Sequence, residues 1–217
     1  TTLFRSLRLP AVPLLMNDPF FSIWSPYDEL KQGATKHWTG ADKPILGLLR
    51  VDGATYRFMG NDNRELLETI LPMADEEVWT APYTTDTPQT GWNTEKFDDS
   101  TWPKAQGAFG DRVRRDVHTK WSGDNTDIYI RRKFELTEAE LNNHFVVRYS
   151  HDDVFEIFIN GVKIHDTGLT WKRRQKLDLS AEQKKLLHKG TNVIAVHCHN
   201  TYGGSYADFG LFKKIIN

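Results

Sequence analysis

The sequence predicts an all-β protein in which a short β-rich segment precedes a two-sheet β-sandwich. Residues 128–134, 145–149 and 154–159 are runs of branched and aromatic residues with partial alternation, which is the pattern of half-buried strands. Only one short helix is expected among these runs, and helices do not alternate with strands as they do in parallel sheets. Many short strands with one connecting helix therefore favour a sandwich over residues 91–217.

The front of the chain, residues 1–75, is predicted to be an incomplete β domain. Residues 20–24 form one strand candidate, and residues 45–58 are expected to fold back about Asp52-Gly53, because glycine accepts the positive φ of a tight turn. Three or four strands bury too little apolar surface to offset their chain entropy. We therefore expect this segment to pack on the sandwich or on another copy of the chain, and the second arrangement would make the chain self-associate.

Two further expectations concern the junction between the two parts. Residues 63–70 are predicted to form a short helix that ends before Pro72. The stretch 76–90 is rich in threonine and proline and is predicted to be an extended linker arm. The sandwich is expected to begin after it, at Gly91.

Inside the sandwich, two local signals predict defined backbone turns. Asn160-Gly161 separates two apolar runs, and this dipeptide is among the strongest signals for a two-residue hairpin turn. Ser180 and Gln183 have the spacing of a capping box, which predicts the start of the one helix, and Gly190 is expected to end it as a left-handed stop.

The composition excludes several classes of partner. The net charge is -1, so no long-range field favours nucleic acid. No run approaches the length of a membrane span, which argues against membrane insertion, and the N-terminus lacks the apolar core of a signal peptide. The one cysteine, Cys198, cannot form an internal disulfide and is expected to be a small buried hydrophobe.

Four ordered blocks of sequence carry a resemblance to a known fold. They resemble the galactose-binding-like jelly roll that serves as the sugar-binding domain of family-two glycoside hydrolases. The blocks are Trp92 with Phe97-Asp98-Asp99-Ser100-Thr101-Trp102, residues 129–134, residues 151–161 and residues 190–196. The resemblance implies a jelly-roll sandwich, and it is far less specific for a ligand.

The front segment carries a second resemblance, to the N-terminus of glutaminase A-like proteins. The residues that carry it lie in 9–14, 18–25, 37–40, 51–53 and 56–60. This resemblance implies a larger secreted or periplasmic hydrolase, in which catalysis belongs to domains downstream of Asn217. Those downstream domains of the parent chain are the partners it implies.

Adjacent carboxylates and paired histidines are the residues that could indicate a catalytic or metal site. Asp98-Asp99 and Asp152-Asp153 are adjacent carboxylates, which in strands point to opposite faces and in turns cap backbone N–H groups, so a loop role is favoured over glycoside hydrolysis. His197 and His199 share one face of a strand, but a zinc site needs three or four ligands. No catalytic residue, metal ligand or cofactor is therefore predicted.

Aromatic residues in loops are the remaining candidates for ligand binding. The apolar face of a sugar ring stacks on an aromatic side chain, while the hydroxyl groups of the sugar bond to polar side chains. Trp121 and Trp171 are expected to be exposed, and Tyr202 and Tyr206 flank the Gly203-Gly204 turn. With His199, these residues are the candidates for carbohydrate binding: Trp121, Trp171, Tyr202, Tyr206 and His199. The alternative is that each packs a loop on the sandwich or touches another domain.

Two functions from different classes follow. In the first, the chain is a non-catalytic architectural module whose N-terminal strands complete a sheet of a neighbouring domain. In the second, the sandwich is a carbohydrate-binding module that directs the parent enzyme to a glycan. An enzymatic function of this chain itself, such as glutamine hydrolysis, is disfavoured because no catalytic constellation is present.

Overall fold

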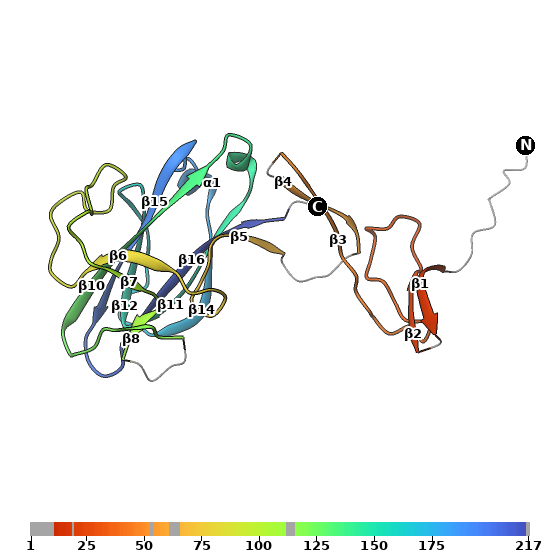
Figure 1. Cartoon of the computed structure of the whole chain (residues 1–217), viewed down its shortest axis with the longest axis horizontal. Helices are drawn as coiled ribbons and strands as arrows, with labels where there is room; N and C mark the ends of the chain where they lie inside the picture. The colour runs from red at the N-terminus through yellow and green to blue at the C-terminus, as the bar shows by residue number, and fades with distance from the viewer. Residues whose placement is uncertain (1–10, 19, 53, 61–65, 112–115, 216–217) are drawn as a thin grey trace, which may run out of the picture. The chain divides into compact units, whose positions relative to one another are not determined.

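The computed structural model describes residues 11–18, 20–52, 54–60, 66–111 and 116–215. The chain divides into two compact units (Figure 1). Unit 1 comprises residues 1–66 and 215–217, and unit 2 comprises residues 67–214. No helix among the described residues is both long enough and apolar enough to cross a membrane.

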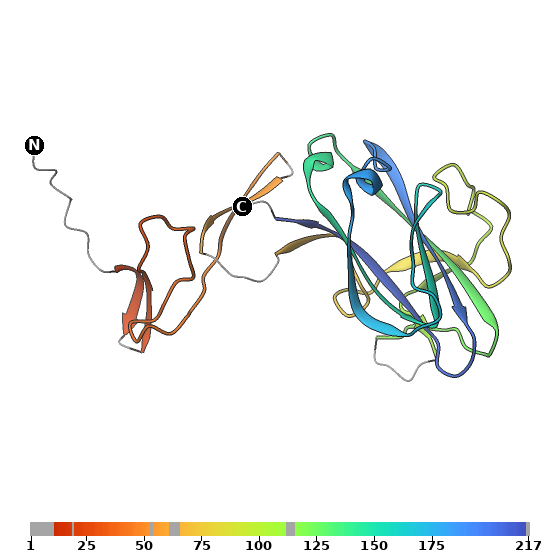
Figure 2. The ribbon, with the colours of Figure 1, turned by 180° about the vertical axis from the view of Figure 1, so that it is seen from behind.

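Unit 2 consists of two sheet layers, which are antiparallel apart from one short parallel pair and which Figures 1 and 2 show from opposite sides. In order, the strands of sheet I are β13 (Val162–Asp166), β12 (Val154–Ile159), β15 (Gly190–Asn200), β10 (Thr126–Leu136), β6 (Thr80–Thr84) and β7 (Lys104–Gln106). Those of sheet II are β14 (Lys172–Asp178), β11 (Phe145–Asp152), β16 (Tyr206–Lys214), β8 (Phe109–Gly110) and β9 (Thr119–Lys120), with β5 (Leu67–Leu71) also paired to β16. The predicted jelly-roll β-sandwich is confirmed.

The core lies between the sheets because alternate residues of each long strand face inward. On sheet I, Ile130, Ile157 and Val196 are fully buried in one hydrophobic cluster. Phe109 and Phe209 of sheet II belong to the same cluster. The longest ladder joins β10 to β15, from Thr126 opposite Asn200 to Leu136 opposite Gly190.

The predicted turn and helix start are both confirmed. Asn160 and Gly161 connect β12 to β13 with φ of 46° and 90°, the left-handed values of a tight hairpin turn. The helix α1 (Ala181–Lys184) begins with the expected capping box of Ser180 and Gln183. Gly190 was expected to end the helix, but it has φ of 90° at the start of β15, and α1 already ends at Lys184.

The junction between the two parts differs from the sequence-based expectation. The stretch 76–90 contains β6, which pairs with both β10 and β7, so it forms part of sheet I. Within 63–70, the expected helix is replaced from Leu67 onward by strand β5, while residues 63–65 lie outside the described residues. In both cases pairing with a neighbouring strand supplies hydrogen bonds that local propensity does not anticipate.

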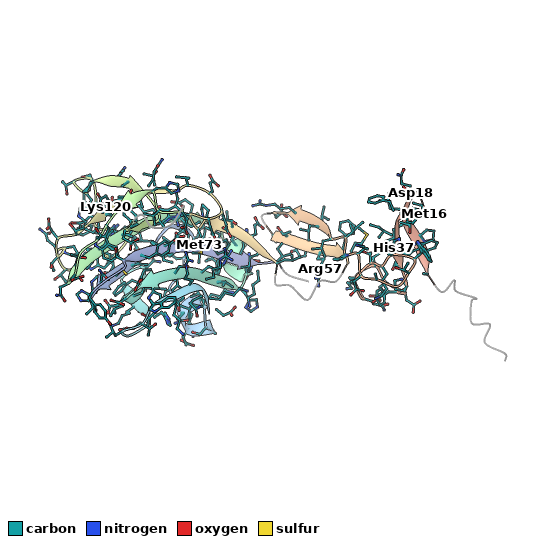
Figure 3. All side chains as sticks on the ribbon, turned by 90° about the horizontal axis from the view of Figure 1, so that it is seen from below. Met16, Asp18, His37, Arg57, Met73 and Lys120 are labelled. Atoms are coloured by element: carbon teal, nitrogen blue, oxygen red, sulfur yellow. The ribbon has the colours of Figure 1, made fainter. Side chains whose placement is uncertain are left out.

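The start of unit 2 covers the outer face of sheet II. Met73, labelled in Figure 3, packs with Val146 and Phe212 on this face. Trp79 enters the main core, where its ring lies edge-on to Phe209 at 5.7 Å between centroids. Residues 67–79 are therefore integral to the sandwich and do not belong to unit 1.

Unit 1 contains two hairpins. The first pairs β1 (Val12–Asp18) with β2 (Phe21–Ser25), and the second pairs β3 (Gly47–Val51) with β4 (Ala54–Met59). The second hairpin confirms the predicted reversal: Asp52 has φ of 49°, and Gly53 lies outside the described residues.

Candidate functional site

The five residues predicted from the sequence do not form one surface. Trp171 precedes β14 with 63% of its surface exposed, and Tyr202 lies between β15 and β16 with 72% exposed. Trp121 and Tyr206 are instead 5% and 2% exposed and belong to the main core. The expectation that Trp121 is exposed is therefore wrong, and the fifth residue, His199, is partly buried.

Backbone contacts explain why the Trp121 loop folds inward. The N–H of Trp121 donates to the carbonyl of Gly110 at 2.8 Å, and its carbonyl accepts from the Ser205 hydroxyl at 2.5 Å. The neighbouring Tyr206 hydroxyl donates to Asp116 at 2.5 Å. The loop before β10 is thus held on the turn before β16, and both aromatic rings are buried with it.

The two strand histidines lie on the outer face of sheet I and bond to carboxylates. His197 Nδ1 is 2.8 Å from Glu156 and its Nε2 is 2.7 Å from Asp127, which also lies 3.0 Å from His199 Nδ1. The His197 ring stacks on Tyr129 with centroids 4.4 Å apart. Among the described residues no group of three or more His, Cys, Asp or Glu side chains has an arrangement that could hold a metal ion.

Three of the four adjacent aspartates make structural contacts, while Asp152 ends strand β11. Asp99 accepts from Arg131 Nε at 2.8 Å, and Asp98 accepts from the N–H of Ser100 at 2.9 Å, a bond that lowers the pKa of Asp98. Asp153 accepts from the N–H of Thr201 at 2.9 Å. Asp98 thus caps a turn, whereas Asp99 and Asp153 join their loops to distant segments of the chain.

A first hollow, the polar hollow, lies on the outer side of sheet II. It encloses about 470 Å³. Ser150 and Asp208 are cross-strand partners on β11 and β16, and Arg174 donates its backbone N–H to the Ser150 hydroxyl at 2.9 Å. The residues that line it are Met73, Asp75, Asp116, Ser150, Arg173, Arg174, Tyr206 and Asp208.

Asp208 is the unusual group in the polar hollow. Its carboxylate is 1% exposed and accepts from the N–H of Ala74 at 3.0 Å and from Trp79 Nε1 at 3.1 Å. Burial raises the pKa of Asp208 to about 6, although these two bonds and Arg132 oppose the shift. Burial also lowers the pKa of Arg132 to about 10, so both groups are charged at neutral pH.

A second hollow, the loop hollow, lies within the connection from β6 to β7. It encloses about 480 Å³ and is lined by Thr84, Asp86, Thr87, Pro88, Gln89, Lys96, Phe97, Asp98, Thr101 and Trp102. It combines two aromatic rings with hydroxyl, amide and charged side chains. This mixture is typical of sites that bind polar ligands with one apolar face.

The loop that forms the second hollow is tied to sheet I through Arg131. This side chain is fully buried, and in addition to Asp99 it donates to the carbonyl oxygens of Trp92, of Thr94 at 3.0 Å and of Phe97 at 3.4 Å. Together these bonds hold the loop as a defined structure over the outer face of the sheet.

Neither hollow was predicted from the sequence. The lining of the polar hollow comes from segments between Met73 and Asp208 that are far apart in the chain, so no spacing reveals it. The residues of the loop hollow are close together in the sequence, where the Thr- and Pro-rich residues 84–90 precede the Trp92–Trp102 block. A local pattern that could have indicated this hollow was therefore present. That block was interpreted only as a mark of the fold.

Comparison with known proteins separates the two parts of the chain. A family model described as a domain of unknown function, DUF4964, matches residues 1–72. No curated protein matches the chain. The matched description states no activity, so the resemblance of the front segment to glutaminase A-like proteins stays a prediction.

Solved structures similar to the chain include glycoside hydrolases of family two. A calcium-binding mutant of Bacteroides uniformis beta-glucuronidase 2 has 15% identity and a TM-score of 0.49 over 69% of this chain and 18% of that chain. A family-two member from Bacteroides cellulosilyticus has 17% identity and a TM-score of 0.46, over 61% of this chain and 20% of that one. A Bifidobacterium dentium beta-glucuronidase has 9% identity and a TM-score of 0.47, over 72% and 31%. The chain thus spans less than a third of each of these enzymes, and its own strand order defines its fold.

Proposed function

We propose that the chain is a non-catalytic architectural module whose residues 11–59 dock on a neighbouring β-rich domain of the same polypeptide. The observation that carries this proposal is the apolar surface of unit 1. Of the 18 exposed large hydrophobic residues described, 13 lie in unit 1: Val12, Leu14, Leu15, Met16, Phe20, Phe21, Leu30, Trp38, Leu48, Leu49, Val51, Tyr56 and Phe58. So much exposed apolar surface marks an interaction site.

The strands of unit 1 support docking on both faces. Every residue of β1 is exposed, including the neighbours Leu15 and Met16, whose side chains point to opposite faces of the strand. In β3, Leu48 and Leu49 are likewise both exposed. A β-rich domain that adds strands to these hairpins would cover this surface and complete the sheets.

The small number of strand pairs in unit 1 also supports docking on a further β-rich domain. Among the described residues, β1 pairs only with β2 and β3 only with β4, while β2 gains a single bridge from Trp24 to Lys36. An isolated two-stranded hairpin is at best marginally stable in water, so additional strands would stabilise both sheets. That the parent is a secreted or periplasmic hydrolase of the glutaminase A-like type rests on the resemblance of residues 9–60.

The test uses the 217-residue chain in the absence of its partner. We expect it to self-associate with rising concentration in sedimentation experiments, because the uncovered hairpins bind one another. The variant Met16→Ser/Phe21→Ser should be monomeric, while Leu169→Ser, an equally exposed position of unit 2, should associate like the wild type. A monomeric wild type whose amides in residues 11–59 exchange as slowly as those of β10 would contradict the proposal.

Carbohydrate binding by unit 2 is a second candidate function, favoured by the loop hollow and by the exposed rings of Trp171 and Tyr202. Stacking on such rings together with hydrogen bonds to their polar neighbours is how proteins hold sugars. A glycan array probed with the whole chain tests it. Binding to a defined saccharide at millimolar or lower concentration is expected, and an array without signal at that concentration would exclude this function.

A further inference from the structure

We propose that the loop hollow, and neither Trp171 nor Tyr202, is the saccharide-binding site of unit 2. This inference rests on the second candidate function and locates it. The hollow lies between residues 84–89 and 96–102, and its volume of about 480 Å³ is of the size of small-molecule sites, about 300–1,000 Å³.

The aromatic wall of the hollow is rigid. The Trp102 ring stacks on Trp92 at 6.3 Å between centroids and lies edge-on to Phe97 at 5.6 Å. Trp92 in turn lies edge-on to Tyr129 and Phe158, at 5.2 and 5.6 Å, on the outer face of sheet I. Because this stack fixes the orientation of Trp102, binding a sugar ring against it costs little side-chain entropy.

The backbone that carries the wall is equally well anchored. Arg131 bonds to the carbonyl oxygens of Thr94 and Phe97, and the Phe97 ring lies 5.1 Å from its guanidinium carbon. On the opposite side, the Thr84 hydroxyl accepts from the N–H of Asp86 at 3.1 Å. Both sides of the hollow are thus preorganised by contacts to the sheet or within the loop.

The polar lining suits a ligand rich in hydroxyl groups. Asp86, Gln89 and Lys96 are exposed at the hollow and provide carboxylate, amide and ammonium groups. Threonine hydroxyls at 84, 87 and 101 add groups that both donate and accept. With Asp98 there are two carboxylates against one ammonium, which disfavours a phosphorylated or sulfated ligand and favours a neutral pyranose.

Trp171 and Tyr202 lie outside the loop hollow. They are among the most exposed aromatic residues described, and neither lines the loop hollow or the polar hollow. An exposed ring outside a hollow provides contact area but encloses little of a ligand. Replacing these two residues therefore controls for saccharide binding by exposed aromatic rings outside the loop hollow.

The test is ¹⁹F NMR of the whole chain labelled with 5-fluorotryptophan and titrated with methyl pyranosides and β-linked disaccharides of glucose, galactose, mannose and xylose. The Trp102 signal is assigned with Trp102→Phe. We expect a saturable shift of that signal at millimolar sugar, and a Kd raised about tenfold or more in Asp86→Ala/Gln89→Ala, which removes two exposed bonding groups. Trp171→Ala/Tyr202→Ala should leave the Kd unchanged.

Two results would overturn the inference, and they differ in meaning. If no saccharide shifts any tryptophan signal and the glycan array is also blank, carbohydrate binding fails together with this site. If a saccharide binds, but Asp86→Ala/Gln89→Ala keeps the wild-type Kd and Trp171→Ala/Tyr202→Ala loses binding, the function stands and the site lies elsewhere. Because Asp86 and Gln89 are exposed, the first variant is expected to fold like the wild type.

Discussion

Replacing Arg131 by methionine is expected to destabilise unit 2 by about 3–5 kcal/mol, the usual cost of removing one partner of a buried ion pair. Arg131 is fully buried, and its Nε lies 2.8 Å from Asp99, which is itself 8% exposed. Methionine fills a similar volume but leaves the Asp99 carboxylate and the carbonyl oxygens of three loop residues without this donor. Urea unfolding followed by tryptophan fluorescence measures the loss.

The neighbouring cation provides the matched control. Lys133 also contacts Asp99, at 3.4 Å, but its side chain is 45% exposed, so Lys133→Met should cost less than about 1 kcal/mol. Hydrogen exchange should accelerate in residues 85–103 of Arg131→Met, because this side chain ties the loop to the sheet. If Arg131→Met is no less stable than Lys133→Met, the loop is held by its aromatic contacts instead.

Asp208→Asn is expected to remove a pH dependence of stability worth about 3 kcal/mol. The pKa of Asp208 rises from 3.8 to about 6 on folding, mainly because the group is buried. The folded state therefore binds the proton more tightly than the unfolded state. It loses stability as the pH rises from about 4 to about 6, and the ionised carboxylate keeps that cost at neutral pH.

The measurement is the free energy of unfolding of wild type and variant at intervals from pH 4 to pH 8. Relative to Asp208→Asn, the wild type should lose about 2 kcal/mol of this free energy between pH 4 and pH 7. Asp86→Asn, a change at an exposed carboxylate, should leave the wild-type profile almost unaltered. Parallel profiles for wild type and Asp208→Asn would show that the Asp208 carboxylate is solvated in the folded state.

Several elements could be predicted because their signals are local. The Asn160-Gly161 turn follows from two residues that tolerate positive φ, and the start of α1 from reciprocal bonds of Ser180 and Gln183 three residues apart. The strands β10, β11 and β12 follow from alternating branched and aromatic residues. Interactions over a few residues encode each of these features, so one sequence suffices to recognise them.

The junction and the buried aromatic residues could not be predicted in this way. Strand β5 forms on β16, about 140 residues later in the chain, and β6 forms between β7 and β10. Trp121 is in a polar stretch of sequence, but bonds to Gly110 and Ser205 carry it into the core. Whether such a segment becomes a strand depends on which distant strand has unpaired backbone N–H and C=O groups beside it. Whether an aromatic side chain is buried depends on the space left between the two sheets.

The sequence by itself therefore determined the all-β class of this protein, its tight turns, its capped helix and the apolar excess of its N-terminal segment. Only the tertiary structure decided where the sites lie. The polar hollow joins Asp75, Ser150 and Asp208 from three separate segments, and the loop hollow depends on Arg131, which is 29 residues from Trp102 in the sequence. Folding sets the burial, pKa and orientation of these side chains, because their surroundings come from the packing of the two sheets and not from their sequence neighbours.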